Sequence, residues 1–157
     1  MGAAYFYHLT DSTLEQTLPM LLEKARGAGW RIMVRAPADD LVDRLDQVLW
    51  TIRPDSFLPH GVAGGPHDAD QPILLGVDVP SKGFECLMSV EGALLTPEEV
   101  SLSQRSCILF NGHDPAAVSV ARERWKALTD QGIEAQYWAQ EDGRWTKKAQ
   151  SDPAAKS

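Results

Sequence analysis

The 157-residue sequence contains no long apolar run and no start that resembles a targeting signal. No stretch of about 18 consecutive apolar residues is present, so the sequence predicts no membrane-spanning helix. The opening Met-Gly-Ala-Ala-Tyr-Phe-Tyr-His lacks the basic start and the apolar segment of a secretory signal. We therefore expect a cytoplasmic protein without membrane contact.

Cysteine is scarce, and no pattern of metal ligands is evident. Cys86 and Cys107 each lie inside an apolar run, which is typical of small core residues in a reducing compartment. No Cys/His spacing indicates zinc. A looser group of polar residues falls in a loop-like segment rich in Pro, Gly and Asp, where we expect solvated turn residues: His60, His67, Asp68 and Asp70. The sequence thus predicts no metal and no cofactor.

Motifs of catalytic and nucleotide-binding chemistry are also missing. No G-x-x-x-x-G-K-[ST] is present, and the glycines of residues 61–65 have neither a clear strand before them nor a helix after them. No nucleophile with an adjacent base can be located. We predict a protein with no catalytic residues that is not an enzyme. The alternative is a small α/β nucleotide-binding domain or enzyme with its site at the carboxyl ends of the strands.

Positive charge is in short supply. The net charge is −7 and the pI is near 5.0, which argues against direct binding of nucleic acid. The imbalance lies in residues 1–113, with 8 Lys/Arg against 15 Asp/Glu, whereas residues 114–148 hold six of each. The basic residues of the later segment are Arg122, Arg124, Lys126, Arg144, Lys147 and Lys148.

What the sequence does contain is a regular alternation of strand and helix patterns. Short apolar or alternating runs predict strands at 3–8, 31–36, 72–77, 84–90, 105–110 and 132–138. Start signals and helical spacing predict helices at 13–28, from 37, from 96 and at 114–132. This order favours a three-layer Rossmann-like α/β fold, with a largely parallel central sheet and helices on both faces. We expect a single domain at 1–146 and a flexible tail at 147–157.

The predicted helix at 114–132 carries an unusual flank. Asp114 can cap its first turn, Pro115 fits the first helical position, and Gly132 can end it in a left-handed conformation. At about 100° per residue, one flank brings together an aromatic, a small apolar residue and two cations: Trp125, Val118, Arg122 and Lys126. Such a flank suits a short acidic peptide with an apolar end. The alternative is a solvated rim, with Glu123 and Asp130 balancing the charge.

Four stretches, in this order, resemble the chi subunit family of bacterial DNA polymerase III, whose members are accessory proteins of the clamp loader. They are Ala4-Tyr-Phe-Tyr-His-Leu, Arg44-Leu-Asp-Gln-Val-Leu-Trp50, Asp55-Ser-Phe-Leu-Pro-His60 with Ala63-Gly64, and Ala121-Arg-Glu-Arg-Trp-Lys-Ala127 with Gly132. The resemblance covers about residues 3–146.

The resemblance implies a non-catalytic protein of Rossmann-like fold that links the clamp loader to single-stranded DNA-binding protein by gripping its acidic, Phe-ended C-terminal tail. Polymerase activity would belong to the holoenzyme. The family's positions for this grip fall on Arg122, Trp125 and Lys126. Trp125 stands where the family pattern has Tyr, and Val118 stands where it has a basic residue. Phe57 matches the aromatic that contacts the psi subunit or a helicase-like partner.

Overall fold

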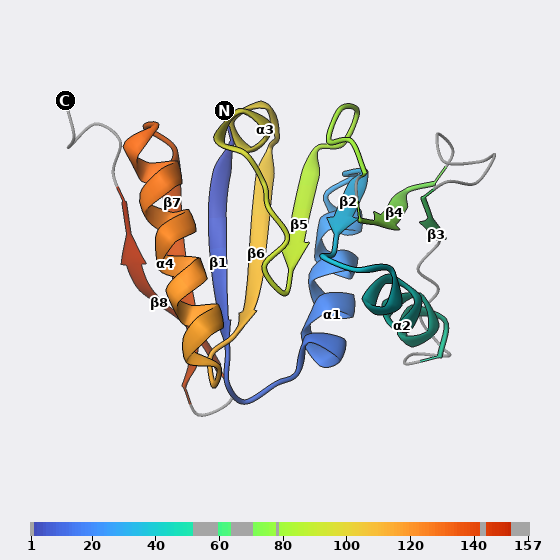
Figure 1. The fold of residues 1–157 in the computed structure, drawn as a ribbon. Coiled ribbons are helices and arrows are strands. Elements are labelled where there is room, and N and C mark those ends of the chain that lie inside the picture. Colours follow the sequence, from blue (N-terminus) through green and yellow to red (C-terminus); the bar gives the residue numbers. More distant parts are fainter. Residues whose placement is uncertain (1, 52–59, 64–70, 78, 142–143, 152–157) are drawn as a thin grey trace.

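The computed structural model of the chain describes residues 2–51, 60–63, 71–77, 79–141 and 144–151. In this part of the chain one sheet has the strand order β3-β4-β2-β5-β6-β1-β7-β8 (Figure 1). All neighbouring strands are parallel except β7 and β8. The strands are β1 (Ala3–Leu9), β2 (Ile32–Arg35), β3 (Gly61–Val62), β4 (Ile73–Gly76), β5 (Cys86–Val90), β6 (Arg105–Asn111), β7 (Glu134–Glu141) and β8 (Arg144–Gln150). The prediction of an α/β fold with a largely parallel sheet is confirmed.

The helices begin where local chemistry predicts them. They are α1 (Leu14–Gly27), α2 (Asp39–Thr51), α3 (Pro97–Leu102) and α4 (Pro115–Asp130). Thr96 and Glu99 form a reciprocal capping box at the start of α3, which satisfies two amides that lack a partner within the helix. At α4 the Asp114 side chain accepts from the Ala116 amide, and Gly132 follows the helix with a φ of 81°. No helix in the described ranges is long and apolar enough to cross a membrane.

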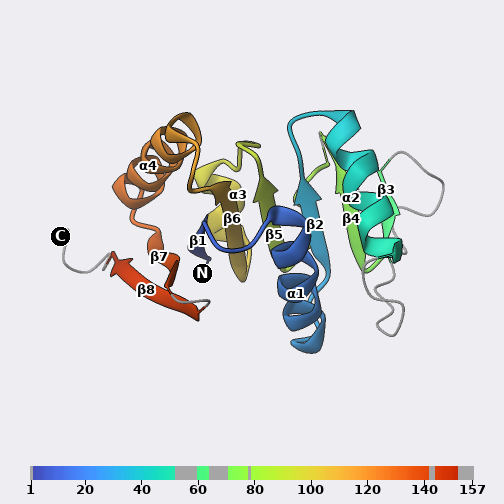
Figure 2. The same cartoon turned by 90° about the horizontal axis from the view of Figure 1, so that it is seen from below.

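Alternating residues of the central strands bury two separate cores. In β2, Ile32 and Val34 enter one cluster with α1 and α2, whereas Met33 enters the other with α3 and α4. The same alternation continues through β4 and β6. Figure 2 shows α1 and α4 on opposite faces of the sheet. The predicted helices on both faces are therefore confirmed.

The sheet continues past the predicted domain boundary. Residues 147–150 belong to β8, which pairs with β7 from Glu141↔Arg144 to Gln136↔Gln150. The Ser151 amide also donates to the Ala135 carbonyl at 2.8 Å. Residues 147–150 thus continue the sheet beyond the expected boundary at 146, while the flexibility of the tail stays a prediction. Backbone pairing with an existing strand holds this polar segment, so it needs no apolar pattern of its own. The remaining residues, 152–157, lie outside the described residues.

His60 is not the solvated turn residue that the sequence suggested. Its side chain is fully buried, and its Nε2 lies 3.0 Å from Asp46 Oδ1 on α2. The pairing of β3 with β4 carries residue 60 inward beneath α2, a position that only the tertiary arrangement defines. The other members of that group, His67, Asp68 and Asp70, lie outside the described residues.

Candidate functional site

The α4 flank, defined as Val118, Arg122, Trp125 and Lys126, combines two exposed cations with two half-buried apolar side chains. Arg122 and Lys126 are exposed and one turn apart. Val118 and Trp125 pack against the core cluster shared by α3 and α4. The predicted grouping of the four residues on one side of a single helix is therefore present. Whether the flank binds a partner stays a prediction.

Trp125 is held in place by aromatic neighbours on two strands. Its ring centroid lies 5.4 Å from that of Phe6 on β1 and 6.2 Å from that of Tyr137 on β7, with interplanar angles of 58° and 68°. These tilted and edge-to-face contacts are favourable geometries for aromatic pairs. Since α4 packs on both strands, the indole forms a fixed wall rather than a mobile side chain.

Tyr137 and His8 extend this wall, and the sequence analysis did not single them out. The Tyr137 hydroxyl lies 2.5 Å from His8 Nδ1, and the two rings meet edge to face at 5.7 Å. Burial raises the pKa of the Tyr137 phenol, and the positive charge of Arg122 partly opposes that rise. Arg122 therefore lies close to a protonated tyrosine on β7. The alternation at 132–138 predicted the strand, but only the sheet order places it beside α4.

The two cations of the α4 flank form no ion pair within the described part of the chain. Among the described residues, no carboxylate lies within ion-pairing distance of Arg122 or Lys126. Glu123, which the sequence offered as a balancing charge, forms no ion pair with either cation in the described part of the chain. Arg124, on the other side of the helix, instead donates to the Gly92 carbonyl at 3.3 Å. The closely spaced positive charges of Arg122 and Lys126 are thus available to an external anion.

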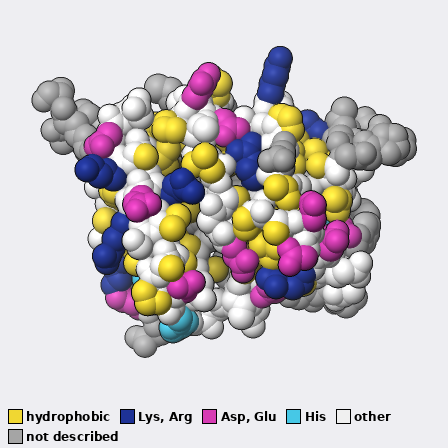
Figure 3. Space-filling model, viewed as in Figure 1, with side chains coloured by type: hydrophobic (Ala, Val, Ile, Leu, Met, Phe, Trp, Pro, Cys, Tyr) yellow, Lys and Arg dark blue, Asp and Glu magenta, His cyan; other side chains and the backbone are white. Residues whose placement is uncertain are grey.

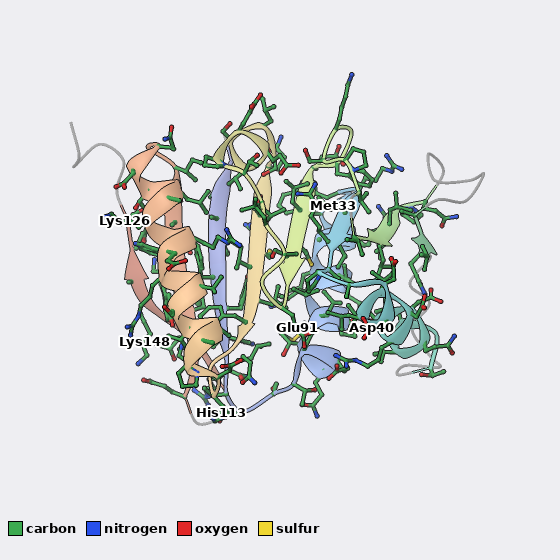
Figure 4. The ribbon with its side chains drawn as sticks, in the orientation of Figure 1. Met33, Asp40, Glu91, His113, Lys126 and Lys148 are labelled. Carbon is green, nitrogen blue, oxygen red and sulfur yellow. The ribbon has the colours of Figure 1, made fainter. Side chains whose placement is uncertain are left out.

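Positive and negative side chains gather on different parts of the surface. Lys and Arg side chains gather along the edge formed by α4 and β8, whereas Asp and Glu side chains gather over α2 (Figure 3). Figure 4 labels Lys126 on α4 and Lys148 on β8, both at this edge. Lys148 is paired with Glu141, and Lys147 donates to Gln150, so these two cations are partly satisfied. Arg122 and Lys126, by contrast, form no ion pair with any described residue.

Arg44, by contrast, is engaged on a different helix. Its Nη2 lies 3.1 Å from Glu15 Oε1 and 3.6 Å from Glu91 Oε1. It belongs to α2, which packs on β3 and β4. These strands lie toward the opposite end of the sheet from β1 and β7, on which α4 packs. This makes Arg44 a suitable control residue for any test of the α4 flank.

The second predicted contact, through Phe57, falls in a part of the chain that the structure does not describe. Phe57, expected to meet a psi-like or helicase-like partner, lies outside the described residues. The prediction of no metal site also remains untested, although no group of three or more His, Cys, Asp or Glu could hold a metal ion within the described ranges.

At the carboxyl edge of the sheet, where the nucleotide-binding alternative would place its site, the amides that follow β1 are bound by a side chain. The amides of Thr10, Asp11 and Ser12 all donate to Gln140 Oε1, at 3.1, 3.0 and 3.1 Å. Gln140 Nε2 in turn donates to Ser12 Oγ at 2.9 Å. Converging amides after the first strand of an α/β sheet can cradle phosphate. Here a glutamine from β7 takes that place.

Comparison with known families matches residues 1–136 to the family described as DNA polymerase III chi subunit, HolC. Among curated proteins, the DNA polymerase III subunit chi of Pseudomonas aeruginosa is 29% identical over 112 residues. That alignment covers 71% of this chain and 76% of the relative. The family match includes the whole of α4 and the first residues of β7.

Proposed function

The chain belongs to the DNA polymerase III chi subunit family, and from that premise we propose that it links the clamp loader to single-stranded DNA-binding protein by binding that protein's acidic C-terminal tail. The family gives it an accessory role in DNA replication. The observation that carries the finer proposal is the α4 flank, where two cations with no ion pair among the described residues stand beside an aromatic wall.

Each residue of the flank suits a different role in binding the acidic tail. Arg122 can engage a terminal carboxylate through two parallel hydrogen bonds, whereas Lys126 supplies a point charge for the acidic side chains that precede it. Trp125 and Val118 would wall the slot for the terminal aromatic ring, and Tyr137 would close its far side. Loss of the family's basic residue at position 118 leaves Arg122 and Lys126 to carry the electrostatic attraction.

The proposed protein is an adaptor without catalytic activity, and it acts in the cytoplasm. Polymerase activity belongs to the holoenzyme it joins. It needs no cofactor and does not contact nucleic acid directly, in keeping with its net charge of −7. A second contact through Phe57 would connect it to a psi subunit, to the clamp loader or to a helicase-like partner.

The proposal is tested by titrating a labelled Asp-rich, Phe-ended peptide and following fluorescence anisotropy. Arg122→Ala and Lys126→Ala should each weaken binding about tenfold or more, because hydrogen bonds to charged groups contribute about 1.5–3 kcal/mol. Binding should also weaken as salt rises, since the flank is solvent-exposed. Amidation of the peptide's carboxyl terminus should have a similar effect to Arg122→Ala.

Arg44→Ala is the matched control, because it removes a cation from the opposite end of the sheet. It should leave the affinity for the peptide unchanged. The assigned site is wrong if the double variant Arg122→Ala/Lys126→Ala binds the peptide as tightly as the unaltered chain.

A further inference from the structure

A cavity separate from the α4 flank opens on the other face of the sheet. It has a volume of about 480 Å³ and lies between α1 and strands β1, β5, β6, β7 and β8. Tyr7 and Trp138, which line it, belong to the core face of α1 and α2, whereas the α4 flank belongs to the opposite face. The volume falls in the range of small-molecule sites, about 300–1,000 Å³.

The walls of this cavity are aromatic rings. Trp30, Trp138 and Trp145 line it with Tyr7, and the three indoles are only half-buried. The rings of Trp145 and Tyr7 meet edge to face, with centroids 5.3 Å apart and an interplanar angle of 88°. The Trp138 indole is fixed by a hydrogen bond of 3.1 Å to Gln136 Oε1. A flat apolar ligand could stack on these rings.

One cation at the cavity, Arg105, stacks on aromatic rings. The Arg105 guanidinium lies 4.4 Å above the ring of Tyr5 and 5.2 Å above the ring of Trp30, stacked rather than paired. No carboxylate of the described residues is within ion-pairing distance of Arg105. Lys24 is the other charged residue among the described residues that line the cavity, so this part of the lining carries positive charge and no acidic side chain.

The neutral polar group at the cavity is also a donor. Burial raises the pKa of the Tyr7 phenol far above its ordinary value, so its hydroxyl stays protonated. The carboxyl end of α1 lies nearby and would by itself disfavour an anion. Lys24 and Arg26 in the last turn of α1 offset that effect, and Arg26 also donates to the Trp30 carbonyl at 2.7 Å.

From this combination we infer that the cavity binds a small aromatic anion, with its ring against Trp138 and Trp145 and its acidic group on Arg105. A guanidinium already stacked on rings is pre-organised, so little rotamer freedom is lost when it pairs with carboxylate or phosphate. The shared ligand chemistry is a planar ring that carries one anionic group. A free aromatic carboxylate and a nucleoside monophosphate both supply it.

The probe for this site is anilinonaphthalene sulfonate, an aromatic anion that accepts energy from nearby tryptophans. It should saturate one site on the full-length chain, with transfer excited through tryptophan. Arg105→Gln should weaken its binding about tenfold or more, and Arg105→Lys should weaken it less. Phenylnaphthylamine, a neutral probe with nearly the same rings, should bind the unaltered chain and Arg105→Gln within about threefold of each other.

A second variant keeps the proposal testable if Arg105→Gln does not fold. Ala28 lines the cavity and is exposed, so Ala28→Phe can fill the space without disturbing Arg105. It should abolish binding of both probes while the thermal midpoint stays within a few degrees. Phenylpropionate and thymidine monophosphate are then compared as competitors, and the stronger one identifies the source of the anion.

The control Arg122→Ala/Lys126→Ala alters the opposite face and should leave the probe's affinity unchanged. Three results would overturn the proposal. These are equal binding of the sulfonate probe to folded Arg105→Gln, loss of probe binding in the α4 double variant, and failure of both competitors to displace the probe.

Discussion

Trp125 serves both the fold and the proposed site, whereas Arg122 and Lys126 serve only the site. The indole packs against Phe6 and Tyr137, so it contributes to the core at the same time as it walls the flank. The two cations are exposed and make no ion pair with the described residues, so their removal should cost little stability. This difference makes the residues separable by experiment.

Trp125→Ala is therefore expected to weaken both folding and peptide binding. Loss of a half-buried indole should lower the free energy of unfolding by roughly 2–3 kcal/mol. Trp125→Tyr keeps an aromatic wall and should cost roughly 1 kcal/mol, with peptide affinity within about threefold. Urea unfolding and peptide titration measure the two effects. An unchanged stability in Trp125→Ala would contradict the packing role of the indole.

Phe57→Ala tests the second proposed contact. If Phe57 is an anchor for a psi-like or helicase-like partner, its removal should abolish capture of that partner, because aromatic anchors carry much of the energy of an interface. The thermal midpoint of the isolated chain should hardly change. A large fall in that midpoint would instead identify Phe57 as a core residue.

At the scale of elements, Arg35 ties β2 to α3 and to the loops around it. Its guanidinium donates to both carboxylate oxygens of Glu99, at 2.9 and 2.8 Å, and to the carbonyls of Val79 and Leu94. Glu99 also completes the capping box with Thr96. One carboxylate therefore serves a helix start and a strand–helix contact at once.

This double role of Glu99 predicts that the free energy of unfolding depends on pH. The hydrogen bonds from Arg35 lower the pKa of Glu99 from 4.5 to about 2. Because the folded-state pKa lies below the unfolded value, the stabilisation is fully present above about pH 5 and is lost as the pH falls toward 2. Glu99→Gln should lower stability at pH 7 by roughly 2 kcal/mol, and this difference should shrink toward zero near pH 2. A difference in unfolding free energy that does not vary with pH would contradict the assigned pair.

At the scale of the whole molecule, opposite charges lie at opposite ends of one sheet. The positive edge of α4 and β8 gives an overall acidic protein a local surface for an anionic protein partner, away from the acidic surface over α2 (Figure 3). At the carboxyl edge between them, the amides that follow β1 already donate to Gln140. Both features favour an adaptor over a nucleotide-binding domain.

A thermal-shift comparison separates these two functions. The acidic peptide at about 100 times its Kd should stabilise the chain by about 2.7 kcal/mol, which corresponds to a rise of roughly 5–10 °C in the thermal midpoint. In the Ala28→Phe variant, whose aromatic-anion cavity is filled, nucleoside triphosphates should produce no such rise, and the purified chain should hydrolyse none. Nucleotide turnover that co-purifies with the chain and is lost on a single substitution would contradict the adaptor function.

The sequence by itself determined the features that depend on residues close together in the chain. The capping box of α3, the ends of α4 and the alternation in the strands follow from a few neighbouring side chains, so they could be predicted. The flank of Val118, Arg122, Trp125 and Lys126 could also be predicted, because helical geometry alone places residues at these spacings side by side.

Only the tertiary structure decided which of these elements meet. Tyr137 joins the wall of Trp125 because β7 lies beside β1, and its hydroxyl contacts His8 across 129 positions of sequence. The burial of His60 beneath α2 and the pairing of residues 147–150 with β7 depend on the same kind of contact. Local sequence patterns carry no signal for such pairings, because their energy comes from surfaces that fold together only once the strand order is set.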